Sequence, residues 1–295
     1  MGVKEIINKR RTETKYKTGG NCVHIRYDGR RQNLKVRCPY SFEDRTVKSL
    51  AMFMLAFERA KPELIGKKLD ILLNCEDFPE TINNSRSIIL SYSKAEGQNV
   101  ELFPDFCFLN WKESGMTDYE ECRKEMLSAS EKAPEYDTLF WIGNPETHPT
   151  RKTLCELSSK DPRIEAYGMG WDYRNGQAVP SKFVSLVDHA KYKYLIDIQG
   201  RGYSGRVKML MFSGRTLFLA DRKWKEFWYK ELEPFVHYIP VKEDLSDLTE
   251  RLDWAENNPE EAKKIAKNAK EFAKEHLTRD AAIDYFARVL IQCAE

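Results

Sequence analysis

Several features that would assign a chain to a specialised class are missing from this sequence. No apolar run reaches the roughly 18 residues that a spanning helix needs, so the sequence predicts no transmembrane segment. The seven cysteines form no C-x-x-C pair, and their odd number disfavours both a disulfide framework and a zinc site. The formal net charge is only +2, so bulk electrostatics does not indicate nucleic acid as a partner.

Targeting signals are also missing from the two ends of the sequence. The first ten residues contain no apolar signal-peptide core, and the last residues form neither a prenylation box nor a retention signal. Because we also expect the cysteines to stay reduced, this pattern predicts a cytoplasmic protein. Residues 1–20 are basic and polar, and we expect them to form a flexible N-terminal arm.

Strand-like and helix-like segments alternate along the rest of the chain, which favours an α/β fold with parallel sheets. A length of 295 residues suggests about two domains. We place the boundary near Ala133-Pro134, so that residues 21–133 form an N-terminal lobe and residues 134–278 a C-terminal lobe. The last predicted helix, residues 279–293, is free to pack back on the first lobe. The predicted strands are 23–27, 34–37, 69–74, 87–92, 138–143, 164–167, 194–198, 216–220 and 237–241. Further helices are predicted at 47–60 and 119–132 and after Asn258, whose side chain we expect to cap the helix.

The most informative segment is a glycine-rich turn that follows an apolar strand and precedes a short helix at 207–213. It reads Gly200-Arg201-Gly202-Tyr203-Ser204-Gly205-Arg206. A turn of this kind presents backbone N–H groups at a positive helix end, which suits a phosphate. Arg206 can add a bidentate contact to a diphosphate, so this segment predicts a phosphate-containing ligand.

Two other interpretations of this turn stay open at this point. Its G-x-G-x-x-G spacing, with Asp221 about twenty positions on, imitates the dinucleotide fingerprint and would indicate an NAD(P)-dependent oxidoreductase. Alternatively, the glycines only make a tight turn at positive φ and bind nothing.

Other candidate residues follow predicted strands. Asp77 comes directly after an apolar strand, where burial can raise a carboxylate's basicity, although a turn aspartate is the simpler interpretation. Asn144 ends another strand, and Arg151 lies a few residues on as a second phosphate clamp or, by spacing alone, a surface arginine. His189 precedes the strand that leads to the glycine turn, and we expect it to be structural.

Residues 185–254 carry a long and specific resemblance to a known family. The matching segments are Leu186-Val187-Asp188-His189-Ala190-Lys191-Tyr192, the turn pattern Gly200-x-x-x-Ser204-x-Arg206, and the run from Glu226 to Ser246. Upstream, Asn74 to Pro79, Tyr92-Ser93-Lys94 and the segment from Phe140 to Arg151 match more weakly. In these residues the chain resembles glycosyltransferase family 90, which contains protein O-glucosyltransferases and capsule-associated xylosyltransferases.

The resemblance implies a fold and an activity. The fold would be of the GT-B kind, with two Rossmann-like lobes, parallel sheets flanked by helices, and a cleft between the lobes. The first lobe would bind the acceptor and the second the UDP-sugar. The activity would be an inverting, metal-independent transfer from a UDP-sugar to a hydroxyl of an oligosaccharide or glycoconjugate. No cofactor is expected, and the absence of any D-x-D pair of metal-binding carboxylates agrees with this.

The resemblance also assigns roles to individual residues. Asp77 would be the general base. The nucleotide would be held by five residues: Asn144, Arg151, Gly200, Ser204 and Arg206.

The sequence also departs from the family pattern. Ile142 stands where the family usually has arginine, so one contact to nucleotide or acceptor is missing or replaced. The signal peptide and KDEL-like ending of the animal enzymes are absent, and the compact size resembles bacterial or large-virus members, such as chlorovirus capsid-glycan xylosyltransferases. This favours xylose as the donor sugar, with glucose next. A non-catalytic glycan-binding protein of the same fold is the remaining alternative.

Overall fold

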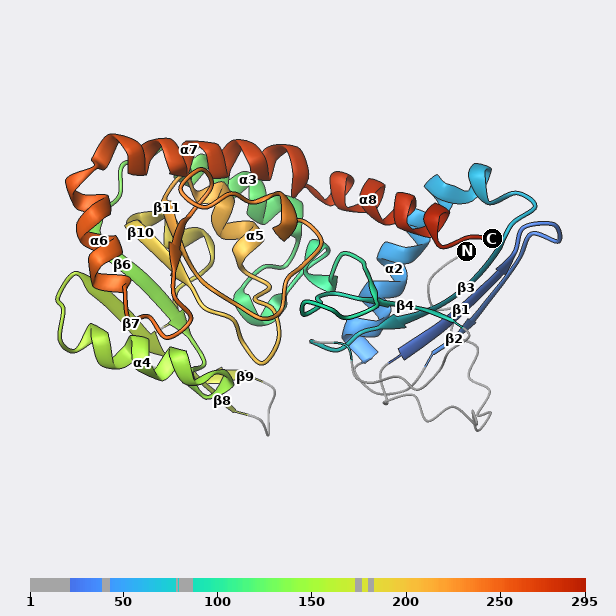
Figure 1. Cartoon of the computed structure of the whole chain (residues 1–295), viewed down its shortest axis with the longest axis horizontal. Helices are drawn as coiled ribbons and strands as arrows, with labels where there is room; N and C mark the ends of the chain where they lie inside the picture. The colour runs from blue at the N-terminus through green and yellow to red at the C-terminus, as the bar shows by residue number, and fades with distance from the viewer. Residues whose placement is uncertain (1–21, 39–42, 78, 80–86, 173–176, 180–182) are drawn as a thin grey trace. The chain divides into compact units, whose positions relative to one another are not determined.

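The computed structural model describes residues 22–38, 43–77, 79, 87–172, 177–179 and 183–295 (Figure 1). The chain forms two compact units. The first contains residues 1–109, 223–227 and 279–295, and the second contains residues 110–222 and 228–278. The predicted N-terminal arm at 1–20 lies outside the described residues. Among those that are described, no helix is both long enough and apolar enough to cross a membrane.

This division differs from the boundary that we expected near Ala133-Pro134. Helix α3 (Tyr119–Ser130) belongs to the second unit because it packs against the short helices η5 (Val187–Lys191) and η6 (Met211–Ser213). Residues 223–227 belong to the first unit because Lys225 forms an antiparallel bridge with Lys94. The structure therefore divides the chain at Leu109, earlier than the sequence suggested.

The first unit contains a mixed five-stranded sheet in the order β2-β1-β3-β4-β5. Its strands are β1 (Cys22–Asp28), β2 (Asn33–Arg37), β3 (Lys68–Asn74), β4 (Ile88–Ser91) and β5 (Glu101–Leu102). Strands β1 and β2 form the predicted hairpin, and Asp28 closes its turn by accepting hydrogen bonds from the amides of Arg30 and Arg31. Strand β3 runs parallel to β4, as expected, but antiparallel to β1.

Two long helices of the first unit pack together. Helix α2 (Glu43–Ala60) contacts α8 (Arg279–Gln292), and the rings of Phe53 and Phe286 meet edge to face at 6.2 Å. Arg59 of α2 pairs with Asp280 and Asp284 of α8. The 3-10 helices η1 (Lys61–Leu64) and η2 (Phe106–Phe108) complete the regular elements of this unit.

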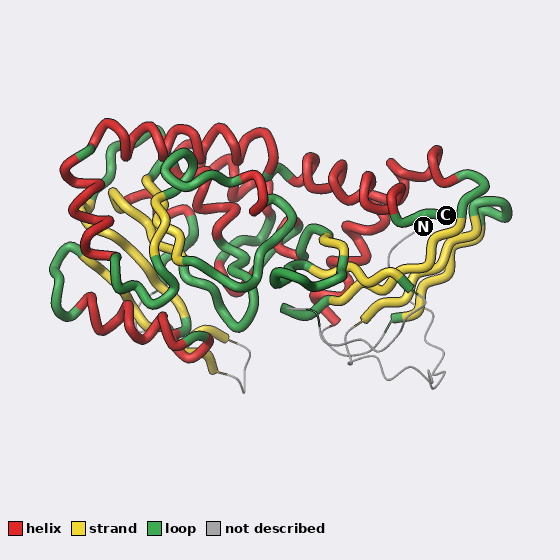
Figure 2. Tube along the Cα trace, in the orientation of Figure 1, coloured by secondary structure: helices red, strands yellow, loops and turns green. Residues whose placement is uncertain are grey.

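The second unit contains a fully parallel sheet in the order β12-β11-β10-β6-β7. Its strands are β6 (Tyr136–Gly143), β7 (Ile164–Gly168), β10 (Tyr192–Asp197), β11 (Thr216–Ala220) and β12 (Ile239–Val241), drawn in yellow in Figure 2. The other helices of this unit are η3 (Lys112–Ser114), η4 (Pro145–Thr147), α4 (Pro149–Ser158), α5 (Val207–Leu210), η7 (Tyr229–Glu231), α6 (Leu248–Asn257) and α7 (Pro259–His276). A small hairpin joins β8 (Gly170–Asp172) to β9 (Gln177–Val179).

Apolar side chains on one face of this sheet form its main core. Leu139, Tyr194, Phe218 and Ile239 from four strands pack there, covered by α4, α6 and the first turns of α7. The opposite face carries η5, whose His189 ring meets Phe140 edge to face at 5.0 Å. Helices on both faces explain why the strands read as nearly continuous apolar runs. The predicted α/β class, with parallel sheets flanked by helices, is confirmed.

The strand order of the second unit defines a switch point. Counted along the chain, β6, β7, β10, β11 and β12 are strands 1 to 5, and their order in space is 2-1-3-4-5. From β6 the chain passes to β7 on one side and then crosses to β10 on the other side of β6. The connections that leave β6 and β10 therefore run in opposite directions along the sheet. In open α/β sheets, ligands bind at the carboxyl ends of the strands beside such a point. This places the expected ligand site at the ends of β6 and β10.

Some local predictions need correction. The Asn258 side chain does not cap α7; its Nδ2 atom donates instead to the Trp254 carbonyl, 2.8 Å away, at the end of α6. Helices α4 and α6 and the β8–β9 hairpin were not predicted. The seven cysteines all lie among the described residues, and none of them forms a disulfide.

Candidate functional site

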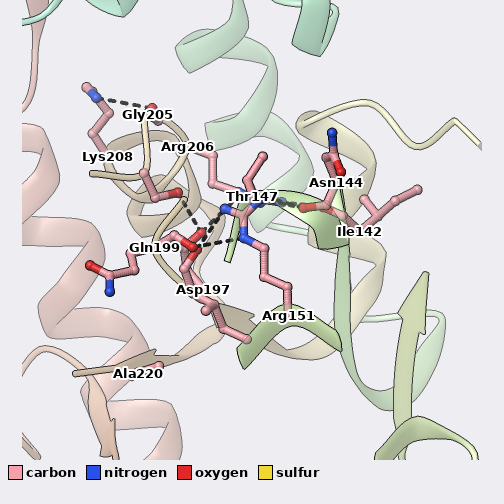
Figure 3. A network of polar contacts seen from close by, with 12 residues as sticks. Ile142, Asn144, Thr147, Arg151, Asp197, Gln199, Gly205, Arg206, Lys208 and Ala220 are labelled. Atoms are coloured by element: carbon pink, nitrogen blue, oxygen red, sulfur yellow. Dashed lines mark hydrogen bonds and ion pairs between the residues drawn. The ribbon is translucent and has the colours of Figure 1, made fainter. Parts of the chain in front are cut away.

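A fully buried carboxylate lies at the carboxyl end of β10. Asp197 is 0% exposed and accepts hydrogen bonds from Ser204 Oγ at 2.9 Å and from Arg222 Nη1 at 2.8 Å. Arg206 Nε lies 3.0 Å from Asp197 Oδ1 as an ion pair, although its angle falls outside hydrogen-bonding geometry. Two guanidinium groups and one hydroxyl thus surround this carboxylate, and Figure 3 shows Asp197 beside Arg206. Burying a charged group is costly unless it is paired in this way.

Arg151 joins the ends of two neighbouring strands. Its side chain is buried and donates to three main-chain carbonyls, those of Asn144 after β6 and of Ile198 and Gln199 after β10, at 2.9–3.1 Å. Burial, and after it the nearby Arg206 cation, lowers the pKa of Arg151 to about 9. No carboxylate in the described part of the chain forms an ion pair with it. The prediction of a surface arginine was therefore wrong, because α4 directs this side chain inward, across the strand ends.

Arg206 is also buried, and burial lowers its pKa. Its Nη1 atom donates to the main-chain carbonyl of Ile142, near the end of β6. The indole of Trp141 contacts both cations, since the guanidinium carbons of Arg151 and Arg206 lie 5.5 Å and 5.6 Å from its ring centroid. Cation–π contacts of this kind help to hold guanidinium groups away from bulk water.

The two arginines give this edge of the sheet an affinity for anions. A guanidinium carries five N–H donors, and the three carbonyl partners of Arg151 leave two of them unused. The described hydrogen-bond partners of Arg151 are neutral carbonyl oxygens, so a bound anion would further relieve the cost of burying its charge. Guanidinium groups match phosphate oxygens in geometry as well as in charge.

The glycine turn lies beside these arginines. The described glycines with positive φ are Gly66, Gly97, Gly115 and Gly214, so the interpretation of the turn as glycines at positive φ is wrong. A Cβ atom on Gly200 would lie 3.5 Å from Arg151 Nη2, which is an ordinary contact. Neither the backbone nor the packing of the described residues requires glycine at position 200.

The helix after the turn contributes less than we expected. The predicted segment at 207–213 is present, but only its first four residues, in α5, are α-helical, and η6 follows. The helix dipole of so short a segment is weak. Any phosphate preference at this turn therefore comes mainly from the arginines.

Asn144 and Ser204 have structural partners in this protein. Asn144 is buried, and its Oδ1 accepts from the amide of Glu146 at 2.9 Å at the start of η4. Ser204 is buried and directs its hydroxyl proton to Asp197. Both residues hold the loops after β6 and β10 in place beside the arginines.

Two other residues considered from the sequence have simple surroundings. His189 is 3% exposed, its Nδ1 lies 2.8 Å from the Ser185 carbonyl, and burial lowers its pKa to about 4. This agrees with a structural histidine. Asp221 is exposed just after β11, and its Oδ1 accepts from the amide of Arg222 at 2.8 Å.

Asp77 belongs to the first unit, in the turn after β3. Its Oδ1 accepts from Arg45 Nη1 at 2.6 Å, and its main-chain carbonyl accepts from Ser93 Oγ at 2.9 Å. The side chain is 35% exposed. Arg45 was not predicted from the sequence, because it lies far upstream and belongs to no local motif.

The structure brings the five candidate nucleotide-binding residues together in the second unit, around the ends of β6 and β10. The sequence missed Trp141, Gly143, Asp197 and Arg222 at the same edge. Only Asp197 gave a signal, as an acidic residue at the end of an apolar strand.

A doubly wound parallel sheet with buried arginines at its switch point defines an α/β protein suited to an anionic, phosphate-containing ligand. The chain belongs to Glycosyl transferase family 90, whose model matches residues 40–295. This membership covers most of the chain, including both units.

Curated relatives of this chain include animal enzymes. Protein O-glucosyltransferase 1 of Rattus norvegicus is 30% identical over 262 residues, which cover 81% of this chain and 64% of the relative. The Homo sapiens protein of the same name is 30% identical over 252 residues, covering 77% of this chain and 63% of the relative. O-glucosyltransferase rumi of Drosophila pseudoobscura pseudoobscura is 28% identical over 242 residues, covering 75% of this chain and 59% of the relative. The chain thus spans less than two thirds of the length of these relatives.

Among solved structures, Anabaena HepE in complex with UDP and glucose matches with 10% sequence identity and a TM-score of 0.41. The match covers 70% of this chain and 63% of that one.

Proposed function

We propose that this protein is an inverting, metal-independent glycosyltransferase that moves a sugar from a UDP-sugar to a hydroxyl group of a glycan. The observation that carries the proposal is the pair of buried arginines, Arg151 and Arg206, at the switch point of the parallel sheet. Membership in Glycosyl transferase family 90 supports the sugar-transfer chemistry. The same membership favours sugar transfer over the alternative activity, that of an NAD(P)-dependent oxidoreductase.

In the proposed reaction, Asp77 accepts the proton of the acceptor hydroxyl while that oxygen attacks the anomeric carbon. The bond from this carbon to the diphosphate oxygen breaks on the opposite face, and UDP leaves with the bonding electron pair. Arg206 and Arg151 stabilise the negative charge that grows on the diphosphate. Main-chain N–H groups after Gly200 would also contact it, with Ser204 and Asn144 fixing the loops around it. The positive charge of the two arginines takes the part that a divalent metal has in other transferases.

The proposed donor sugar is glucose. The names of the curated relatives contain glucose, which favours UDP-glucose over the UDP-xylose that the sequence suggested. These two sugars differ by one hydroxymethyl group, so a few side chains of the sugar pocket decide between them. The acceptor and the compartment in which the protein acts stay predictions.

A panel of nucleotide sugars tests the function without a known acceptor. The protein is incubated with UDP-glucose, UDP-xylose or other UDP-sugars, and the release of UDP to water is measured. We expect slow hydrolysis of one donor above the others. A thermal shift with NAD and none with UDP would contradict the proposal, and UDP binding without hydrolysis of any donor would favour a non-catalytic glycan-binding protein.

A further inference from the structure

The proposed base, Asp77, is held by an arginine from another element of the first unit. Arg45 lies in the first turn of α2, and its Nη1 donates to Asp77 Oδ1 at 2.6 Å. The two side chains are 30% and 35% exposed, so the pair sits at the surface of the unit but is partly shielded. Ion pairs of this exposure contribute little to stability, so stability alone does not explain this contact.

The arginine is itself fixed from two sides. Its guanidinium carbon lies 5.0 Å from the ring centroid of Phe106, a buried residue of η2. Its main-chain carbonyl accepts from Ser49 Oγ at 2.8 Å, and that hydroxyl also pairs with the buried hydroxyl of Tyr92. The ring of Phe106 thus restricts the side chain, while Ser49 holds the main chain from which it extends, and such support is typical of groups that orient a reacting residue.

The two partners of the ion pair are anchored to consecutive residues. Tyr92 reaches the backbone of Arg45 through Ser49, and Ser93, 0% exposed, donates from its Oγ to the Asp77 carbonyl at 2.9 Å. Both residues follow β4 directly. One short segment thus holds the main chain at both partners, from which the guanidinium and the carboxylate extend toward each other.

This arrangement leaves one carboxylate oxygen available. Asp77 Oδ1 is taken by Arg45, while Oδ2 has no hydrogen-bond partner among the residues that the structure describes. A base needs one oxygen within hydrogen-bond reach of the proton that it accepts, and a misplacement of about 1 Å can cost about 10²-fold in rate. Because the ion pair with Arg45 uses Oδ1, Oδ2 of Asp77 stays available to accept a proton.

We propose that Arg45 is a positioning residue that holds Oδ1 of Asp77 so that Oδ2 faces the acceptor hydroxyl. The inference rests on the proposed function, since it assigns Asp77 the role of base. Phe106, Ser49 and Ser93 support the ion pair. The Tyr92-Ser93 segment thus has a role in holding the proposed base.

The test compares Arg45→Gln, Arg45→Lys and Arg59→Gln in the full chain, with UDP-glucose as donor and water as acceptor. We expect Arg45→Gln to lower kcat about 10- to 100-fold while KM for UDP-glucose and the Kd of UDP stay within about threefold. Arg45→Lys keeps the cation and should recover part of the loss. Arg59→Gln is the matched control, because it removes another aspartate-paired arginine of the same helix and should leave kcat unchanged.

A double variant separates positioning from a general structural effect. In an Asp77→Asn background, Arg45→Gln should cause no further loss, because the group that it positions is already inactive. If the double variant loses activity by the product of the two single losses, the proposal is overturned. Full activity of the single variant Arg45→Gln would also overturn it. If Arg45→Gln does not fold, Phe106→Leu replaces it. We expect Phe106→Leu to lower kcat about 3- to 10-fold with unchanged UDP affinity, and unchanged kcat would overturn the proposal.

The two proposals fail in different ways. If Asp77→Asn keeps normal turnover, the assignment of Asp77 as the base is wrong and the proposed function must change. If Asp77→Asn is inactive but Arg45→Gln is fully active, only the positioning role is wrong.

Discussion

A Cβ atom on Gly143 would lie 2.9 Å from Arg206 Nη2 and equally close to the indole of Trp141. Real Cβ atoms do not approach other atoms so closely, so glycine at this position makes room for the Arg206 guanidinium beside the end of β6. The position that Arg206 takes toward a diphosphate thus depends on a residue that precedes it by more than sixty positions.

Replacing Gly143 with alanine should therefore weaken nucleotide binding. The new methyl group has to displace either Arg206 or the buried Trp141, whose ring the Arg206 guanidinium contacts, so either movement disturbs the proposed diphosphate ligand Arg206. We expect the Kd of UDP, measured by calorimetry, to rise about tenfold or more, in line with the loss of about one charge-assisted hydrogen bond. Arg206→Lys provides the comparison, and an unchanged UDP affinity in both variants would contradict the diphosphate role of Arg206.

Gly200→Ala should separate folding from binding. The Cβ atom has room, because its nearest neighbour is at 3.5 Å, and the backbone is not left-handed, so the melting temperature should stay within about two degrees. If the diphosphate approaches the main chain here, the methyl group will hinder it, and the Kd of UDP should increase about tenfold. A variant with normal stability and normal affinity would show that no ligand approaches Gly200 closely.

Asp77→Asn should remove most of the catalytic activity. General-base assistance contributes about 10²- to 10⁴-fold, and an amide cannot accept the proton. We expect kcat for UDP release to fall by that factor while the affinity for UDP stays nearly the same. Single-turnover measurements at saturating UDP-sugar check the first expectation and calorimetry the second. Normal kcat would rule Asp77 out as the base.

The proposed chemistry should not require a divalent metal. In the proposed reaction, Arg151 and Arg206 would supply the positive charge that stabilises the leaving diphosphate. Turnover in excess EDTA should therefore equal turnover in untreated buffer. If activity is lost in EDTA and manganese restores it, a metal takes part and the arginine-only account is wrong.

His189 should make the stability of the protein depend on pH. Burial lowers its pKa from 6.5 to about 4, so the unfolded chain binds a proton in this range that the folded chain does not bind. The free energy of unfolding should accordingly fall as the pH drops from 6.5 toward 4, by up to roughly 3 kcal/mol at about 1.4 kcal/mol per pKa unit. Above pH 6.5 His189 is neutral in both the folded and the unfolded chain, so it no longer lowers the free energy of unfolding.

The variant His189→Asn tests whether His189 causes this pH dependence of stability. Asparagine keeps a donor for the Ser185 carbonyl but cannot take up the proton. Urea unfolding at several pH values between 4 and 7 should give a clearly shallower slope for the variant. Equal slopes would mean that other buried groups cause the pH dependence.

Much of the second unit was predictable because its strands are buried on both faces. Apolar runs such as Tyr194 to Ile196 and Leu217 to Ala220 have few alternatives to a central parallel strand. The glycine turn and Arg206 were found for the same reason, since they follow such a strand directly. Helix α4 was missed, because its sequence carries charged and polar residues without a clear apolar stripe.

The partners of the candidate residues were not predictable. Arg151 looked like a surface arginine by spacing, yet it links the ends of β6 and β10 because the parallel sheet places those ends side by side. Arg45 approaches Asp77 only because the first turn of α2 lies near the end of β3. Neither contact has a counterpart in local sequence.

The sequence by itself determined the α/β class, most of the strands, the candidate residues and the family to which they point. Local patterns carry this information, because burial of a strand and conformation of a turn depend on neighbouring residues. Only the tertiary structure decided which charges meet: Asp197 with Arg206 and Arg222, Arg151 with three carbonyls, and Arg45 with Asp77. Most of these contacts join residues from different strands, helices or loops, and the energy of a charge depends on the groups that surround it in space.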